Sequence, residues 1–457
     1  MILTKRRTKQ SEGECEMIKK YTYGTPFPTE SVTEQFAASE GMPEFGTIHL
    51  QEGFSFTYRL RDEDIVYGLG EANRGINKRG YQYISNNSDN AHHHEDVYSL
   101  YASHNFMIVS GEQTFGLYFD YPSTLTFDVG YTRSDELHIF CDRADLDLYV
   151  ITGENPYDIT KQFRKMIGRS YIAPKFAFGF GQSRWGYKTP EDFVTVAEKY
   201  RENHIPIDMV YMDIDYMDNY KDFTVNEEFR DFPQYVENLK KDHIRLVPII
   251  DAGVKIEEGY DVYEEGVEKN YFCKRQDGSD FVAAVWPGYT HFPDVLNPDA
   301  RKWFGEKYKR LTDAGIEGFW NDMNEPAIFF TPEGVKDVKE AMKAFIDKEE
   351  TVQDVWAIGA QVTGLANNAE DYAAMYHNVD GKMVQHDQVH NLFGYNMTRA
   401  AGEGLREISP DKRCLLFSRS SYIGMHRYGG IWTGDNKSWW SHILLNLKMM
   451  PSLNMCG

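Results

Sequence analysis

Three aspartates, Asp213, Asp322 and Asp435, each come directly after a short apolar run that the sequence predicts to be a β-strand. Carboxylates that follow parallel strands of a barrel converge on one mouth, where loops from different strands meet. Two such carboxyl groups can cleave a glycosidic bond: one attacks the anomeric carbon and the other protonates the leaving oxygen. One of these aspartates alone would mean little, because a strand-end Asp often caps the next helix.

The two catalytic roles require different protonation states, an ionised nucleophile and a protonated acid. Asp435 comes just before a predicted helix at 437–449, whose positive end would lower the pKa of its carboxyl group. If Asp435 is the acid, burial and a neighbouring carboxylate must outweigh that effect. The alternative is that Asp435 stays ionised and caps this helix.

The chain after Pro174 alternates between strand-like and helix-like segments, which predicts parallel strands and an incomplete (β/α)8 TIM barrel of six strands. An open α/β sheet is the alternative, and long insertions after the third and fourth strands favour the barrel. The predicted strands cover residues 176–182, 209–214, 245–250, 318–321, 414–417 and 429–432, and the predicted helices cover 189–203, 233–242, 298–313, 389–407 and 437–449.

The first third of the chain reads as β structure. Residues 46–61 alternate apolar and polar side chains, and short apolar runs separated by turn residues follow them. This pattern predicts an N-terminal antiparallel β-sandwich. We therefore expect a disordered extension at 1–16, with Met17 as the natural start, a β-sandwich domain at 17–172 and the catalytic barrel at 173–457.

Two motifs resemble those of glycoside hydrolase family 31, the α-glucosidase and α-xylosidase family. They are Trp-Asn-Asp-Met-Asn-Glu-Pro at 320–326 and Ile-Trp-Thr-Gly-Asp-Asn at 431–436, and the resemblance is strongest to bacterial α-glucosidases of gut Firmicutes. It implies that Asp322 is the nucleophile, that Asp435 is the acid/base and that Arg419 contacts sugar hydroxyls. Such long, ordered motifs rarely agree by chance.

The resemblance also implies further walls of a sugar pocket. Tryptophan rings can stack on a pyranose, although some of them would serve barrel packing instead. Asp213 can accept hydrogen bonds from two adjacent hydroxyls. The expected binding residues from the barrel are Trp185, Asp213, Ile249 (or Ile250), Trp286, Trp320 and Trp432, together with Arg419.

One further pocket residue is expected from the N-terminal domain. Asp89, in Asn-Asn-Ser-Asp-Asn at 86–90, is the candidate, with Asp96 as the fallback and a solvated loop carboxylate as the alternative for both. Glu325 lies only three residues after Asp322, so the two cannot easily face opposite sides of one bond. We assign Glu325 to structural hydrogen bonding.

These residues predict a retaining, exo-acting α-glucosidase that releases glucose from short α-glucans by double displacement and needs no cofactor or metal. The alternatives are an α-xylosidase or an α-glucan transglycosylase on the same scaffold, or a non-catalytic carbohydrate-binding relative. The family adds pocket residues and β domains after the sixth strand. We therefore expect this chain to be a fragment with weak activity and poor solubility on its own.

Bulk properties narrow the partners to small oligosaccharides. A formal net charge of −21 argues against nucleic acid and anionic membrane surfaces, and no apolar run is long enough to span a membrane. Five scattered cysteines favour free thiols in the cytoplasm, and a homo-oligomer stays possible. The histidines at 92–94 are expected to be solvated, and His386 with His390 is expected to form a polar helix face without metal.

Overall fold

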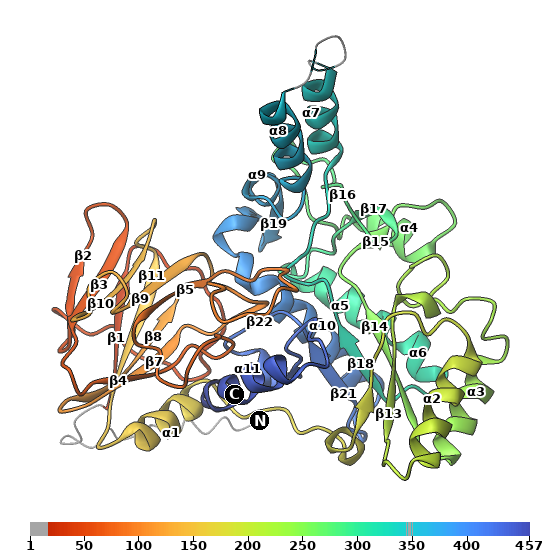
Figure 1. Cartoon of the computed structure of the whole chain (residues 1–457), viewed down its shortest axis with the longest axis horizontal. Helices are drawn as coiled ribbons and strands as arrows, with labels where there is room; N and C mark the ends of the chain where they lie inside the picture. The colour runs from red at the N-terminus through yellow and green to blue at the C-terminus, as the bar shows by residue number, and fades with distance from the viewer. Residues whose placement is uncertain (1–16, 344, 346–348, 350) are drawn as a thin grey trace, which may run out of the picture.

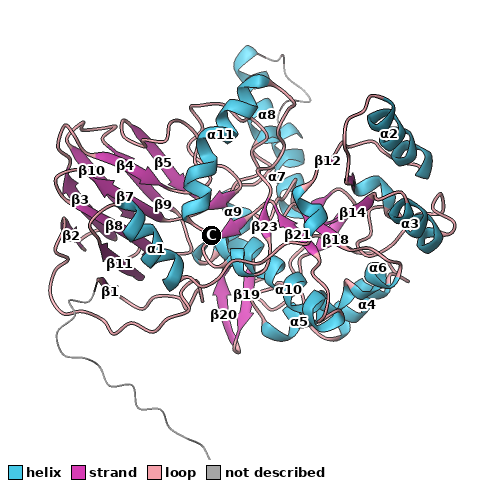
Figure 2. Ribbon diagram, turned by 90° about the horizontal axis from the view of Figure 1, so that it is seen from below, coloured by secondary structure: helices cyan, strands magenta, loops and turns pink. Residues whose placement is uncertain are grey.

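The computed structural model describes residues 17–343, 345, 349 and 351–457, and the disordered extension expected at 1–16 lies outside them. A β-sandwich packs beside a parallel sheet that carries helices (Figures 1 and 2). The fold class expected from the sequence, an antiparallel sandwich followed by an incomplete TIM-type barrel, is confirmed.

The sandwich consists of two five-stranded antiparallel sheets. In β3 and β10 alternating side chains are buried, as in Phe54 and Phe56, and the two inner faces form one aromatic core around Phe119. The first sheet has the order β1 (Ile18–Tyr23), β11 (Leu146–Thr152), β8 (Thr114–Asp120), β7 (Phe106–Ser110) and β4 (Ile65–Gly68). The second has the order β2 (Thr47–His49), β3 (Phe54–Arg59), β10 (Glu136–Cys141), β9 (Leu125–Val129) and β5 (Tyr81–Ser85).

The parallel sheet has six strands in chain order, which is the curled half of a barrel that the sequence predicted. The first strand is a partial correction. Only two residues of the predicted strand at 176–182 reach far enough to pair with Met209 and Val210, and Lys175–Phe178 forms a 3-10 turn instead. The strands are β12 (Gly181–Gln182), β13 (Met209–Met212), β14 (Arg245–Ile250), β18 (Gly318–Asn321), β21 (Leu415–Ser418) and β23 (Gly430–Ile431).

Some of the helices in this part of the chain begin at local capping signals. Thr189 and Asp192 form a capping box at the start of α2, and Asn297 caps α5. The predicted helix at 298–313 is interrupted at Tyr308, which separates α5 from α6. The helices are α1 (Pro156–Met166), α2 (Pro190–Glu202), α3 (Phe232–Lys241), α4 (Asp261–Glu268), α5 (Pro298–Lys307), α6 (Lys309–Asp313), α10 (Phe393–Ile408) and α11 (Trp440–Met455).

Two insertions rise above the sheet. The first forms a small sheet after β14, and in the second α7 and α8 project away from the body of the molecule (Figure 1). A hairpin closes the second insertion and leads into α10. The elements are β15 (Val254–Lys255), β16 (Ala283–Val285), β17 (Gly288–His291), α7 (Pro332–Lys343), α8 (Val352–Thr363), α9 (Ala369–Ala374), β19 (Tyr376–Val379) and β20 (Lys382–Gln385).

The sandwich is joined to the barrel through backbone and side-chain contacts. Strand β6 (Ala102–Ser103) of the sandwich pairs with β22 (Ser421–Tyr422) of the barrel. The Tyr422 hydroxyl donates to the buried carboxylate of Asp120 at 3.0 Å, which also accepts from the hydroxyl of Ser31. Buried carboxylates need such donors, so these contacts fix the two parts of the chain against each other.

Helices α5 and α10 cross at two glycines. A Cβ atom built on Gly404 would lie 2.3 Å from the carbonyl oxygen of Gly305, and one on Gly305 would lie 2.2 Å from the carbonyl oxygen of Ala400. The backbones can therefore approach this closely only because neither residue has a side chain.

We expect Gly404→Ala to lower the free energy of unfolding by about 1–3 kcal/mol, the usual cost of overpacking a buried contact. Urea unfolding measures it. Gly359→Ala is the matched control: Gly359 is also inside a helix, α8, but its added Cβ would meet nothing within 4 Å. That variant should gain about 0.5–1 kcal/mol from helix propensity. Equal shifts in the two variants would contradict the close crossing.

Candidate active site

One buried arginine organises the ends of the parallel strands. Arg419 follows β21 and is only 1% exposed. The Glu325 carboxylate binds it at two points, with Nε to Oε1 at 2.9 Å and Nη2 to Oε2 at 2.7 Å. Asp322 Oδ1 also lies 2.9 Å from Nε. Such paired carboxylate contacts fix the guanidinium plane.

Two carboxylates reach the same guanidinium from elsewhere in the chain. Asp89, in the loop after β5 of the sandwich, lies 3.4 Å from Arg419 Nη2. Asp435, in the loop after β23, lies 3.5 Å from Nη1. The structure therefore brings the expected residues Asp89, Asp322, Arg419 and Asp435 together, whereas the fallback Asp96 is exposed and contacts His94.

The turn after β18 aims two carboxylates at one guanidinium. The backbone N–H of Asp322 donates to Ile250 O, which extends the strand pairing by one residue. Met323 then adopts a left-handed backbone with φ of 54°, and its N–H donates to Asp322 Oδ1 at 2.7 Å. The Asn324 side chain accepts from Ser420 N at 3.0 Å. Glu325 thus has the structural bonding role that the sequence predicted.

Opposing effects act on the pKa of the Asp322 carboxyl group. Burial raises the pKa of the Asp322 carboxyl well above its ordinary value, the Arg419 guanidinium lowers it, and Asp435 and Glu325 raise it. Burial likewise raises the pKa of Glu325, again against Arg419. Desolvation therefore opposes the ionised form that a nucleophile needs, and Arg419 favours that form. One cation thus faces four carboxyl groups.

The alternative in which Asp435 caps the next helix is wrong. Helix α11 begins at Trp440, three residues later than predicted, and its N-cap position is Trp439. Gly434 has φ of 77°, which turns Asp435 back toward Tyr101. The Asp435 side chain is 46% exposed and contacts Arg419 instead.

Tyr101 was not anticipated from the sequence. Its ring lies under the Arg419 guanidinium, with 4.8 Å between the guanidinium carbon and the ring centroid. Its hydroxyl donates to Asp435 Oδ2 at 3.4 Å and accepts from Asp435 N at 3.3 Å. No local motif marks this residue, because its partner lies 334 positions away in the sequence.

The expected aromatic walls form two pairs. The Trp320 ring meets Trp432 edge-to-face at a centroid distance of 4.9 Å, and its Nε1–H donates to Met212 O. Ile249 is buried and pairs with Trp320 across the sheet.

The second pair is more open. Trp185 and Trp286 are 62% and 40% exposed, and their centroids lie 5.6 Å apart. Trp286 also contacts Phe329, seven residues after the nucleophile candidate. Exposed aromatic faces of this kind suit a sugar surface.

Asp213 and a missed aspartate lie beside this cluster. Burial, with smaller contributions from Asp215 and Asp435, raises the pKa of Asp213 to about 6, although the backbone N–H of Ile214 lowers it. Asp251 directly follows β14, is 3% exposed, and has a pKa raised well above its ordinary value by burial and by Asp322. The same strand-end signal that pointed to Asp213 could have found Asp251.

Several histidine expectations need correction. His93 is not solvated but buried, stacks on His442 and has its pKa lowered to about 4 by burial. His386 and His390 are buried in 3-10 turns rather than on a polar helix face, because α10 begins only at Phe393.

Among the residues that the structure describes, one group has metal-like spacing: Cys273, Asp294 and His377, with ligand atoms within 4.8 Å of one another. Burial raises the pKa of the Cys273 thiol well above its ordinary value, and a metal requires the thiolate. Asp294 and His377 are already hydrogen-bonded to each other at 2.8 Å. We therefore assign no metal to this group.

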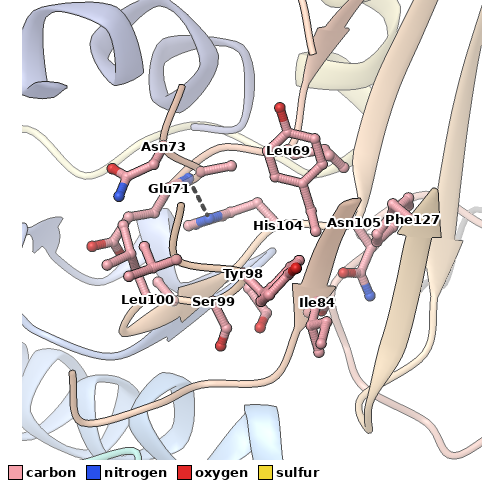
Figure 3. A pocket seen from close by; sticks show the side chains of 16 residues that line it. Leu69, Glu71, Asn73, Ile84, Tyr98, Ser99, Leu100, His104, Asn105 and Phe127 are labelled. Atoms are coloured by element: carbon pink, nitrogen blue, oxygen red, sulfur yellow. Dashed lines mark hydrogen bonds between the residues drawn. The ribbon is translucent and has the colours of Figure 1, made fainter. Parts of the chain in front are cut away.

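A cavity in the sandwich lies near the cluster (Figure 3). It measures about 30 Å³, which is far below the several hundred cubic ångströms of a sugar-sized site. Glu71 lines it, and burial together with Glu325 raises the pKa of Glu71 well above its ordinary value.

Comparison with known proteins defines the class. Residues 170–457 match the glycosyl hydrolases family 31 TIM-barrel domain, and residues 8–128 match the galactose mutarotase-like N-terminal domain of the same family. The first match alone covers more than half of the chain. The chain belongs to glycosyl hydrolase family 31.

Two of the relatives that the chain resembles are named as alpha-glucosidases. The chain is 35% identical to alpha-glucosidase 2 of Bacillus thermoamyloliquefaciens over 89% of its own length, and 27% identical to an alpha-glucosidase of Saccharolobus solfataricus over 97%. It spans 48% and 62% of those two proteins. In the described part of the chain, no helix is long and apolar enough to cross a membrane.

Solved structures agree in fold. A family 31 dextranase of Flavobacterium johnsoniae in complex with glucose superposes with a TM-score of 0.73 at 22% identity, over 89% of this chain and 46% of that one. A family 31 alpha-glucosidase of Bacteroides thetaiotaomicron gives 0.70 at 26% identity, over 88% and 60%.

We expect Gly434→Ala to destabilise the fold more than Gly278→Ala. Both residues have positive φ, but a Cβ on Gly434 would lie 2.0 Å from the Tyr101 ring, whereas one on Gly278 meets nothing within 4 Å. The control should lose about 1–2 kcal/mol from backbone strain, and Gly434→Ala about 1–3 kcal/mol more. Chemical denaturation of both variants measures this difference. Equal losses would show that Tyr101 does not hold the Asp435 loop.

Proposed function

We propose that the chain carries the catalytic centre of a retaining, exo-acting α-glucosidase that removes terminal glucose from short α-glucans. The observation that supports it is the placement of Asp322 and Asp435 on different nitrogens of one guanidinium. Both carboxyl groups are thus held close together, as double displacement through a glycosyl-enzyme requires. The identities of the family relatives support the α-glucoside substrate class.

In the proposed mechanism, the two carboxyl groups act in different protonation states. Asp322 can attack only when ionised, and Asp435 can assist departure of the leaving group only when protonated. The state with the proton on Asp435 and the negative charge of Asp322 against Arg419 Nε fulfils both conditions. Because Asp435 is half exposed, it can afterwards take a proton from water that attacks the glycosyl-enzyme.

Sugar binding would use donors and acceptors that the cluster leaves open. Arg419 Nε and Nη2 are occupied by Asp322, Glu325 and Asp89, whereas Nη1 has only the 3.5 Å contact to Asp435. Nη1 is therefore the guanidinium nitrogen best placed for a sugar hydroxyl. We assign Asp213 and Asp89 as acceptors for hydroxyls at the closed end, and the exposed Trp185 and Trp286 as walls near the entrance.

We also propose that residues 17–172 and 173–457 act as two domains of one catalytic unit. The Asp89 contact to Arg419 supports the unit, because the sandwich supplies part of the site. A cytoplasmic location is supported by the free thiols Cys141, Cys273, Cys414 and Cys456.

The two catalytic roles predict different responses to the leaving group. Asp435→Asn should lower kcat/KM for maltose by roughly 10²–10⁴-fold, the usual value of general acid catalysis. It should lose much less on nitrophenyl α-glucoside, because nitrophenolate departs without a proton. Asp322→Asn should lose activity on both substrates. Steady-state kinetics on the two substrates measures this.

Asp313→Asn serves as the control, since Asp313 is exposed on α6 and pairs only with the nearby Lys309. It should match the wild-type chain. Release of the α-anomer, followed by proton NMR before mutarotation, should accompany turnover. Equal losses on both substrates for Asp435→Asn, or a β-anomer product, would overturn the role assignment. If the chain turns over an α-xyloside in preference to an α-glucoside, the proposed activity is that of an α-xylosidase instead.

A further inference from the structure

Three buried histidines form a continuous hydrogen-bonded row behind the Arg419 cluster. His377 Nε2 lies 2.9 Å from His386 Nδ1, and His386 Nε2 lies 2.8 Å from His390 Nδ1. At one end, His377 Nδ1 lies 2.8 Å from Asp294 Oδ1. At the other, His390 Nε2 lies 2.7 Å from the carbonyl oxygen of Asn87. All three rings are buried.

The hydrogen bond at the Asn87 end determines which ring nitrogen carries the proton in each histidine. A backbone carbonyl can only accept, so His390 Nε2 carries a proton. Burial lowers the pKa of His390 to about 4 and that of His386 well below its ordinary value, so both rings are neutral and their Nδ1 atoms accept. His386 Nε2 therefore donates to His390, and by the same logic His377 Nε2 donates to His386.

This order leaves one proton to place at the other end. His377 Nε2 is already protonated, and its Nδ1 faces Asp294 Oδ1. Two bare acceptors at 2.8 Å would repel, so one proton must lie between the imidazole of His377 and the carboxyl group of Asp294. The other oxygen of Asp294 accepts from Asn378 N at 2.7 Å, which holds the carboxyl group in place.

The row ends on the loop that presents Asp89. The Asn87 side chain donates to Ser420 Oγ at 2.7 Å, next to Arg419, and Asn87 N donates to Asn391 Oδ1 at 2.9 Å. Two residues further on, Asp89 reaches the Arg419 guanidinium. The position of the Asn87 carbonyl thus sets where the sandwich loop meets the barrel.

We propose that Asp294, His377, His386 and His390 form a one-directional hydrogen-bond relay that positions the 86–90 loop, and with it Asp89, against Arg419 for sugar binding. The proposal rests on the proposed function for the role of Asp89. The four are positioning residues, since none touches the reacting atoms. The relay spans three segments, because Asp294 follows β17, His377 lies on β19 and His390 precedes α10.

The relay predicts a sharp difference between two substitutions of Asp294. In Asp294→Asn, the amide nitrogen can donate to His377 Nδ1 while the amide oxygen accepts from Asn378 N, so every hydrogen bond is kept without the extra proton. Asp294→Ala removes the partner of Asn378 N and leaves His377 Nδ1 with only its longer 3.6 Å contact to the Cys273 thiol. We expect Asp294→Asn to keep KM for an α-glucoside within about twofold, and Asp294→Ala to raise KM roughly tenfold or more with little change in kcat.

His390 offers a second matched pair. In His390→Gln, the amide nitrogen can donate to Asn87 O and the amide oxygen can accept from His386 Nε2, so the direction of the relay is kept. His390→Ala should raise KM as Asp294→Ala does, and His390→Gln should restore most of the affinity. If His390→Gln and Asp294→Asn raise KM as much as the two Ala variants do, the relay is overturned.

Nitrogen-15 NMR of the histidine side chains tests the relay without any turnover. His386 and His390 should be neutral with the proton on Nε2 in the wild-type chain, in Asp294→Asn and in an Asp322→Asn chain that cannot react. An Nδ1–H tautomer at either ring would overturn the proposal. If the tautomers are as stated but no chain, wild type included, binds or turns over an α-glucoside, the proposed function fails and the role of Asp89 in the relay fails with it.

Discussion

The site depends on one guanidinium that holds four carboxylates from three parts of the chain. Glu325 and Asp322 come from the turn after β18, Asp435 from the loop after β23 and Asp89 from the sandwich. Buried carboxylates without a cation cost several kcal/mol each. The loops after β18 and β23 and the sandwich loop must therefore take their native positions together. Each of them supplies a carboxylate whose negative charge is balanced by the same guanidinium.

Contacts elsewhere in the fold hold this cluster in place. The β6–β22 pairing and the Tyr422–Asp120 contact fix the sandwich beside the segment that directly follows Arg419. Tyr101 then supplies both a ring under the guanidinium and a hydroxyl for Asp435. The N-terminal sandwich is thus part of the site, and a barrel without it would lack Asp89 and Tyr101.

Local signals in the sequence were sufficient for the parallel sheet and for most of the carboxylates. Strand-end aspartates such as Asp322 lie where the strand period and the barrel geometry require, and the six strands follow from their apolar runs. The same signal applies to Asp251 and was overlooked. The predicted start of α11 was wrong because Gly434 turns the chain away from helical geometry before Trp440.

Contacts between distant segments could not be read from local patterns. Tyr101 and the histidine row carry no motif, and each owes its role to partners that only the tertiary fold brings near. His386 and His390 have the spacing of a polar helix face, yet both are buried, His390 against Asn87 of the sandwich loop and His386 between Tyr372 and Phe393. The raised pKa of Asp322 also could not be read from the sequence, because desolvation depends on how much protein surrounds the carboxyl group.

The most direct test of the central role of Arg419 is the stability of Arg419→Met as a function of pH, measured by urea unfolding beside the wild-type chain. At neutral pH the variant should lose about 3–5 kcal/mol, because carboxylates stay buried without their cation. Burial raises the pKa values of Asp322 and Glu325, so acidification protonates them in the fold and removes their need for a cation. The loss should therefore shrink as the pH falls. A loss below about 1 kcal/mol, or one that does not change with pH, would contradict the account.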